Sequence, residues 1–362
     1  MARKKMLNFT VGPVQIDKEI LEIGREPLPY FRTPEFSALM KENEILMKKF
    51  VEADDDARVV FLTGSGTAAM EAVVMNVFNE NDKVIVINGG SFGKRFTQLC
   101  QIHDVPYSEI KLDYGEALTK KHLDGFRGKG YTGFLVNLHE TSTGVYYDKD
   151  LISEFCQKNN LYLVMDSISS FIADAFNMSD LKVDVVLIGS QKALALPPGL
   201  SIIVINSRAI YKISQNDVKS MYFDLMDYLK NGERGQTPFT PAVGILIQLN
   251  KRLRMINEEG IENEIRKINE IANNFRASIQ DLPFRITSES MSNALTPLEP
   301  TGDVSAFKIV EILKDEYNIF VCPTGGELAD KLFRVGHIGA LSIDDNSALV
   351  TALEDMKKRG II

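Results

Sequence analysis

The 362-residue chain is short of cysteine, of histidine and of long apolar runs, and each shortage excludes a class of protein. Cys100, Cys156 and Cys322 lie far apart without C-x-x-C spacing, which predicts neither a disulfide framework nor a zinc site. The four histidines show no metal-ligand spacing. No stretch approaches the ~18 apolar residues of a membrane span, and the start MARKKMLNFTVGP lacks the apolar segment of a signal peptide. We therefore expect a cytoplasmic protein without a metal and without a membrane partner.

Positive charge is also scarce. The formal net charge is −8, and no basic run is longer than the RKK of residues 3–5. This balance argues against a nucleic-acid partner and favours small molecules. With 44% hydrophobic and 25% charged residues, the composition is typical of a globular protein, and the length allows about two domains.

Short β-rich runs alternate with helical patterns between about residues 58 and 205. The runs are RVVFL, KVIVI, FLVNL, LYLVMD, DVVLI and SIIVI, and apolar residues recur at helical spacing in GTAAMEAVVMNVF and DLISEFCQKNN. Several runs are apolar nearly throughout, which predicts a mainly parallel sheet covered by helices on both faces. Ligands should then bind at the carboxyl ends of the strands.

The second part of the chain has a different pattern. A long helical stretch over about 241–279, broken near Glu259 and Gly260, is followed by strand-like residues 283–296. A helix over VSAFKIVEILKDEYN, a strand over KLFRVG and a helix over NSALVTALEDMKKRG then predict a smaller α+β domain. The expected division of the chain is an N-terminal segment near the active site, a large domain and a small domain, at residues 1–20, 21–258 and 259–362.

Polar residues follow three of the predicted strands. The segment 63–67, TGSGT, lies between RVVFL and a helix, which suits either a phosphate cup or a simple N-cap. Asp166 ends an apolar run, where a carboxylate needs a helix start or a buried cation. Lys192 follows DVVLI and precedes a Pro-Pro-Gly turn. In a parallel sheet, these positions open onto one crevice.

A phosphate cup, a carboxylate for a pyridine nitrogen and a lysine that can form a Schiff base are the protein parts that pyridoxal phosphate requires. Phe92, in NGGSFGKRF, can cover the face of the cofactor ring. Two other phosphate motifs fit less well. GGSFGKR lacks P-loop spacing, and TGSGTAAME has Ala69 where the dinucleotide-binding motif has its last glycine.

The ordered motifs TGSGT, NGGSFG, HETSTG, MDSISS, GSQKAL-x-x-PPG and FRVGHIG resemble those of the class V aminotransferases of fold type I. The similarity is greatest to the alanine–glyoxylate, serine–glyoxylate and 2-aminoethylphosphonate–pyruvate transaminases, and it extends from NFTVGP to FRVGHIG. This resemblance implies pyridoxal 5′-phosphate as cofactor and a homodimer with shared active sites. The fold that it implies is a mainly parallel, seven-stranded sheet between helices, with a smaller C-terminal α+β domain.

The resemblance also implies roles for individual residues. Lys192 would form the Schiff base, and Asp166 would pair with the pyridine nitrogen. The other cofactor-binding residues that it implies are Ser65, Gly66, Thr67 and Gln191 at the phosphate, Phe92 on the ring, Thr141 at the phenolic oxygen, and Thr237 from the neighbouring subunit. At position 92 the family commonly has Trp or Tyr, so Phe92 lacks a polar group found there.

Two arginines are candidates for substrate binding. Arg334, in FRVGHIG, matches the family's carboxylate-binding arginine, whose planar fork suits bidentate contacts. Arg32, in YFRTPEF, either meets a second anionic group of the substrate, or pairs with Glu35, or caps a helix that starts near Pro34. The histidines at positions 139 and 337 lie inside motifs, yet we expect structural or surface roles for all four.

The expected reaction is ping-pong transamination, in which Lys192 moves the Cα proton. The donor would be alanine, serine, aspartate or 2-aminoethylphosphonate, and the acceptor a 2-oxo acid such as pyruvate or glyoxylate. A cysteine desulfurase or lyase is the alternative within the fold, but Gln191 stands where those enzymes have His, and Cys322 lies in VCPTGG, which is not typical of a mobile catalytic loop. An NAD-dependent oxidoreductase would leave S-x-Q-K unexplained, and a non-catalytic binding module would not need the lysine, aspartate and cup.

Overall fold

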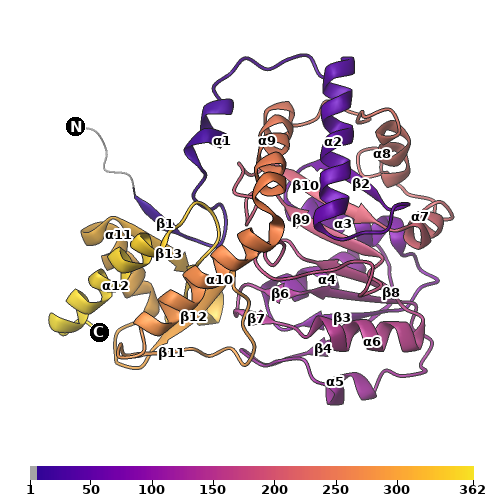
Figure 1. Ribbon diagram of the computed structural model, residues 1–362. Coiled ribbons are helices and arrows are strands. Elements are labelled where there is room, and N and C mark those ends of the chain that lie inside the picture. Colours follow the sequence, from indigo (N-terminus) through magenta and orange to yellow (C-terminus); the bar gives the residue numbers. More distant parts are fainter. Residues whose placement is uncertain (1–5) are drawn as a thin grey trace.

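Two sheets organise the chain, one built from its middle and one from its two ends (Figure 1). The computed structural model describes residues 6–362, so the RKK run lies outside the described residues. The larger sheet has seven strands in the order β2-β10-β9-β8-β5-β3-β4, and the smaller has five in the order β1-β13-β14-β12-β11. A two-stranded ribbon, β6 (His139–Glu140) and β7 (Val145–Tyr146), completes the strands.

The larger sheet is parallel except for β10, which is antiparallel to both of its neighbours. Its strands are β2 (Arg58–Thr63), β3 (Val84–Asn88), β4 (Tyr107–Lys111), β5 (Gly133–Asn137), β8 (Tyr162–Asp166), β9 (Val185–Gly189) and β10 (Leu200–Ile205). Six of them contain the apolar runs that predicted strands. The seventh, β4, is an edge strand of sequence YSEIK, whose polar residues gave no such signal.

Helices cover both faces of this sheet because side chains alternate along each strand. Val60 and Leu62 of β2 pack in one apolar cluster, whereas Val59 and Phe61 pack in another on the opposite face. The first face carries α3 (Gly66–Val77), α4 (Ser91–Ile102), α7 (Ser207–Ile213) and α8 (Leu225–Gly232). The second carries α2 (Pro34–Phe50), α5 (Lys120–Asp124), α6 (Lys149–Asn159) and α9 (Val243–Glu259).

The smaller sheet combines the N-terminal strand with the C-terminal part of the chain. Its strands are β1 (Leu7–Phe9), β11 (Phe284–Arg285), β12 (Leu295–Pro300), β13 (Ile319–Pro323) and β14 (Phe333–Gly336). The helices beside it are α10 (Ile261–Ser278), α11 (Ala306–Tyr317) and α12 (Ile343–Lys358). Together they bury a third apolar cluster, separate from the two of the larger sheet. Two short elements remain, α1 (Lys18–Ile23) and the 3₁₀ turn Gly326–Leu328.

The helical stretch predicted over 241–279 is two helices that meet at Gly260. Gly260 has a φ of 90°, which favours glycine and ends α9 at the predicted break. The strand-like region 283–296 contains β11 but only the beginning of β12, and neither β1 nor β13 was predicted. The domain boundaries after residues 20 and 258 remain predictions. The pairing of β1 with β13 ties the N-terminal segment to the smaller sheet.

Candidate active site

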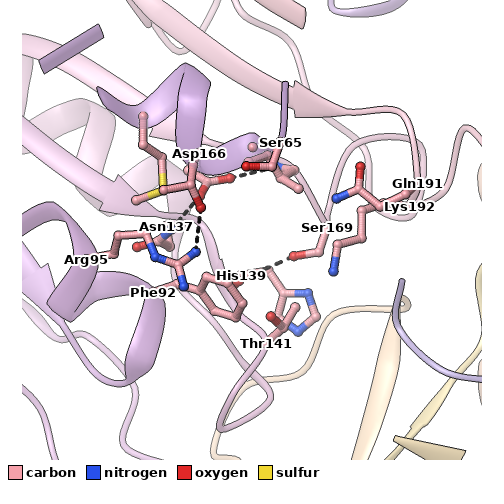
Figure 2. A pocket seen from close by; sticks show the side chains of 14 residues that line it. Ser65, Phe92, Arg95, Asn137, His139, Thr141, Asp166, Ser169, Gln191 and Lys192 are labelled. Carbon is pink, nitrogen blue, oxygen red and sulfur yellow. Dashed lines mark hydrogen bonds between the residues drawn. The ribbon is translucent and has the colours of Figure 1, made fainter. Parts of the chain in front are cut away.

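A cavity of about 220 Å³ lies at the carboxyl ends of the parallel strands (Figure 2). Predicted site residues that line it are Lys192, Asp166, Ser65, Gly66, Thr67, Phe92, Thr141 and Gln191. Lining residues that the sequence analysis missed are Met70, Arg95, Asn137, His139, Ile168 and Ser169. The fold therefore brings most of the motifs together in one place, although they span more than a hundred residues of sequence.

The TGSGT segment leads from β2 into α3 and leaves the hydroxyl of Ser65 unused at the helix start. Ser65 is the N-cap residue, but its side chain makes no capping hydrogen bond. Oγ of Ser201 instead fixes the segment by donating to the Ser65 carbonyl at 2.6 Å. An added Cβ at Gly66 would lie 2.3 Å from Cδ1 of Ile168, so a larger residue there would have to displace the Ile168 side chain. A helix N-terminus with an uncommitted hydroxyl suits a phosphate group.

Phe92 and Arg95 form a second wall from the first turns of α4. They are three residues apart, so they lie on the same side of the helix. The guanidinium carbon of Arg95 lies 5.0 Å from the centroid of the Phe92 ring, and Nη1 donates to Oγ1 of Thr67 at 2.9 Å. Arg95 thus adds a cation to the cup. Its helical spacing from Phe92 is the signal that could have found it.

Glu140 holds the beginning of α4 against the HETSTG loop. Its buried carboxylate accepts hydrogen bonds from the backbone N–H of Phe92 at 3.2 Å, of Gly93 at 2.8 Å and of Ser142 at 3.2 Å. Negative charge is favourable at a helix N-terminus. Burial raises the pKa of Glu140, and these hydrogen bonds oppose that shift. Glu140 therefore fixes Phe92 and the neighbouring Thr141 in one unit.

Asp166 is buried without a cationic partner among residues 6–362. One oxygen accepts the backbone N–H of Ile168 at 2.9 Å, and the other accepts Nδ2 of Asn137 at 2.5 Å. Burial raises the pKa of Asp166 to about 6, despite these hydrogen bonds. Asn137 ends β5 as Asp166 ends β8, so a polar residue that closes an apolar run was the missed signal. A carboxylate in this state is complementary to a protonated pyridine nitrogen.

Lys192 lies in the turn after β9 and enters the cavity from the side opposite the Phe92 wall (Figure 2). Burial lowers its pKa to about 8, so a substantial neutral fraction is present near pH 7. The N-terminal segment packs against this side chain. An added Cβ at Gly12, whose φ is 130°, would lie 2.6 Å from Cδ of Lys192.

Arg334 reaches toward the same site from β14 of the smaller sheet. Its side chain is buried, Nη1 donates to the Thr141 carbonyl at 2.8 Å, and Nη2 donates to the Pro323 carbonyl. Nε has no partner within the described part of the chain. Its positive charge contributes to lowering the pKa of Lys192, although burial is the larger cause. The predicted carboxylate-binding arginine therefore lies next to the cavity wall.

Arg32 and Thr237 lie together, but outside the lining of this cavity. Arg32 donates to the backbone carbonyls of Thr237 and Pro238, each at 3.2 Å, and the Thr237 hydroxyl donates to the Phe239 carbonyl. Within the described residues, no ion pair joins Arg32 to Glu35. The Arg32 guanidinium is bound to the 237–238 backbone, and a contact of Arg32 with a second anionic group of the substrate stays a prediction.

The cavity fits pyridoxal phosphate on its own geometry. The cup offers a helix N-terminus, Ser65 and Arg95, Asp166 lacks a cation, and Oδ1 of Asn137 is buried without a partner. The part of the chain that the structure describes contains no group of three or more His, Cys, Asp or Glu that could hold a metal ion. Nor is any helix within it long and apolar enough to cross a membrane.

Comparison with known proteins agrees with this geometry. Residues 30–332 match the family model for aminotransferase class-V. An uncharacterized aminotransferase of Methanocaldococcus jannaschii is 31% identical, covering 98% of this chain and 92% of the relative. The L-aspartate–glyoxylate aminotransferase of Paracoccus denitrificans is 27% identical, covering 92% and 86%.

Among solved structures, the alanine–glyoxylate aminotransferase of Nostoc sp. superposes with a TM-score of 0.92 at 25% identity, covering 99% of this chain and 96% of that one. The shared fold is that of the fold type I aminotransferases, which use pyridoxal 5′-phosphate. A matched family model that spans most of the chain, together with a cavity that provides the cup, the aspartate and the lysine, identifies the protein as a member of the class V aminotransferase family and a pyridoxal-phosphate-dependent transaminase.

Proposed function

We propose that the protein transfers an amino group from a small donor to a small 2-oxo acid. The donor would be alanine, serine, aspartate or 2-aminoethylphosphonate, and the acceptor pyruvate or glyoxylate. The observation that carries this proposal is the buried guanidinium of Arg334, which lies against Thr141 in the cavity wall. A single planar cation suits one carboxylate. The glyoxylate aminotransferases among the relatives agree with such an acceptor.

The proposed roles follow from the surroundings of each residue. When bound, pyridoxal phosphate supplies the electron sink for the reaction. Asp166 would hold the pyridine nitrogen protonated, because a buried, ionised carboxylate stabilises a nearby cation. Nζ of Lys192 takes the proton from Cα of the donor and later returns a proton to Cα of the new amino acid. Its lowered pKa makes the neutral amine available for this step.

Cofactor binding would use the remaining wall residues. The groups that would hold the phosphate are the hydroxyls of Ser65 and Thr67, the backbone N–H of Gly66, and the side chains of Gln191 and Arg95. Phe92 would cover the ring, and Thr141 would contact the phenolic oxygen. Arg334 would exchange its two carbonyl contacts for the substrate carboxylate, which pairs charge with charge.

The proposed active unit is a homodimer. Thr237 and Arg32 lie away from the cavity of their own subunit, which suits a contact with the partner's phosphate site. Large apolar side chains are exposed in the same region, where Tyr222 stacks on Phe239 at 5.3 Å between centroids. The most exposed are Leu28 (64%), Tyr30 (68%) and Met221 (81%). Apolar groups exposed together favour an interface.

A substrate panel tests the reaction. Alanine, serine, aspartate, 2-aminoethylphosphonate and cysteine would be offered as donors, each with pyruvate, glyoxylate or 2-oxoglutarate. We expect transfer from at least one small donor to glyoxylate or pyruvate. Release of sulfide from cysteine, without amino transfer in any pair, would contradict the proposal and favour the desulfurase alternative.

Subunit mixing tests the shared site. Lys192→Ala and Thr237→Ala subunits would each be nearly inactive alone if Thr237 reaches the partner's phosphate. After subunit exchange, hybrids contain one site with neither substitution, so part of the activity should return. Verified exchange without recovery, or a fully active monomer, would contradict the shared site.

A further inference from the structure

One side chain in the cavity wall has all of its polar atoms buried and without a hydrogen-bond partner within the described chain. His139 lies on β6, is 3% exposed and lines the cavity, and neither Nδ1 nor Nε2 is bonded. The other three histidines each have at least one bonded ring nitrogen. Nε2 of the buried His337, for example, lies 2.8 Å from Oγ1 of Thr296. The expected structural role therefore does not account for His139.

The backbone directs this imidazole into the cavity. Because side chains alternate along an extended segment, His139 and Thr141 lie on the side opposite Glu140. Glu140 points to the start of α4, where it accepts the N–H of Gly93. In Figure 2 the imidazole of His139 lies beside Thr141, in the same space as Nζ of Lys192.

The charge around His139 decides what it can recognise. Burial lowers its pKa to about 3, and the positive charges of Lys192, Arg276 and Arg334 lower it as well. The ring is therefore neutral near pH 7 and offers one N–H donor and one nitrogen acceptor. Buried polar groups are normally hydrogen-bonded. A ligand is therefore expected to supply the hydrogen-bond partners that the described chain does not provide for the two ring nitrogens.

We propose that His139 contacts the side chain of the amino donor and favours a donor that carries a hydroxyl group. This inference rests on the proposed function, because it requires a donor whose carboxylate is held by Arg334. A hydroxyl both donates and accepts a hydrogen bond, as the neutral imidazole does. A methyl group would leave the imidazole unpaired, and a second carboxylate can only accept.

Two unreactive ligands separate this contact from turnover. 2-Methylserine and 2-methylalanine lack the α hydrogen, so they can bind but cannot be converted, and they differ by one hydroxyl. Their dissociation constants would be measured from the change in visible absorption of the holoenzyme. We expect wild-type protein to bind 2-methylserine about tenfold more tightly, and His139→Phe to remove this preference while changing 2-methylalanine binding by less than about threefold.

His139→Gln is the matched conservative variant, because it keeps a donor and an acceptor and should retain part of the preference. His139→Ala, which also removes both ring nitrogens, decides the question if His139→Phe does not fold. The cofactor dissociation constant should stay near the wild-type value in all three. The ratio of kcat/KM for serine over alanine should fall in parallel with the binding preference.

Several results would overturn the inference. Equal binding of the two ligands by wild-type protein would do so, as would an equal loss for both in His139→Phe. Weaker cofactor binding with an unchanged ligand ratio would assign His139 to the cofactor instead. If the holoenzyme binds neither ligand, the proposed small-donor function fails as well, so the two failures can be told apart.

Discussion

A buried aspartate lies at each end of the larger sheet, and only one of the two has a cationic partner among the described residues. Asp184 precedes β9 at the amino end and is paired with a cation: Nη1 of Arg208 lies 3.0 Å from its carboxylate, which also accepts the N–H of Leu163 and Nδ2 of Asn206. Asp166 ends β8 at the carboxyl end, and none of its bonds within residues 6–362 is to a cation.

The neighbours of the two aspartates repeat this difference. At the carboxyl end, Oδ1 of Asn137, both ring nitrogens of His139 and the hydroxyls of Ser167 and Ser170 are buried without partners. At the amino end, within the described chain, no side-chain atom of Asp184 is buried without a hydrogen-bond partner. Folding alone explains the polar groups of the amino end. Those of the carboxyl end are unfavourable for folding, and the unpaired atoms of Asn137 and His139 belong to the cavity wall, as is typical of a ligand site.

The largest effect should come from Lys192→Ala. We expect no measurable amino transfer, because no other amine lines the cavity among the described residues. The fold should persist, since the crevice is formed by strand ends, and far-ultraviolet circular dichroism with thermal unfolding would check this. Retention of most of the turnover would refute the role of Lys192.

Asp166→Asn should slow the reaction by ~100-fold or more while still allowing the cofactor to bind, because a neutral amide cannot hold the pyridine nitrogen protonated.

The cofactor-free Asp166→Asn variant should be more stable than wild type at pH 7. Burial raises the folded pKa to about 6 from 3.8, so the stability from this group is present below about pH 4 and is lost as the pH rises through 6. Removing the charge should add about 2–3 kcal/mol to the free energy of unfolding at pH 7.

Asp184→Asn is the matched control at the other end of the sheet. Burial raises the pKa of Asp184 as well, although its hydrogen bonds and the charge of Arg208 oppose that shift. Loss of the buried charge and loss of the ion pair therefore act on stability in opposite directions, and the gain in the free energy of unfolding at pH 7 should be smaller than in Asp166→Asn. The kcat/KM of Asp184→Asn should stay near the wild-type value. If both variants lose activity equally and neither changes stability, the contrast between the two ends is wrong.

The pH dependence of cofactor attachment tests whether burial at the carboxyl end of the sheet lowers the pKa of Lys192. In the proposed role, the neutral amine of Lys192 would add to the cofactor aldehyde, and burial lowers the pKa of this amine to about 8. The attachment rate in cofactor-free protein should therefore rise about tenfold per pH unit below 8 and level off above it. Stopped-flow absorbance from pH 6 to 9.5 would measure this. A rate that rises beyond pH 9, as with an ordinary lysine such as the side chain of N-acetyl-lysine, would contradict the shift.

The smallest effect should come from Arg32→Ala. Because Arg32 holds the carbonyls of Thr237 and Pro238, its loss should weaken cofactor binding by about threefold to tenfold and raise KM equally for all donors. Arg32→Lys should restore part of the binding. A rise in KM confined to aspartate and 2-aminoethylphosphonate would instead show that Arg32 contacts the second anionic group of the substrate.

The sequence predicted those parts of the fold whose physical cause is local. Strands buried on both faces appear as apolar runs, and Gly260 marks the break between α9 and α10 because only its backbone turns there readily. The edge strand β4 and the short strand β1 escaped because half-exposed strands carry polar residues. Motif residues such as Lys192 could be located because each follows a strand.

His139 and Arg95 lie inside quoted sequence motifs, yet nothing in those motifs marks their side chains as lining the site. His139 looks like any loop histidine until the alternation of β6 turns it into the cavity. Arg95 becomes a wall residue only once α4 places it one turn after Phe92. The position of Arg32 depends on a segment two hundred residues away, and no pattern in the sequence joins the two. Contacts of this kind arise from tertiary packing alone.

The carboxylate of Glu140 also couples the opening of the HETSTG loop to the opening of the first turn of α4. The amide protons of Phe92 and Gly93 are buried against it, so they exchange with solvent only when the HETSTG loop and the first turn of α4 separate. The ring wall and the loop beside it therefore fluctuate together. In hydrogen-exchange measurements on the cofactor-free protein, the amides of Phe92 and Gly93 should be protected to the same degree as each other. Equal protection would show that they belong to one cooperative unit that forms without a ligand.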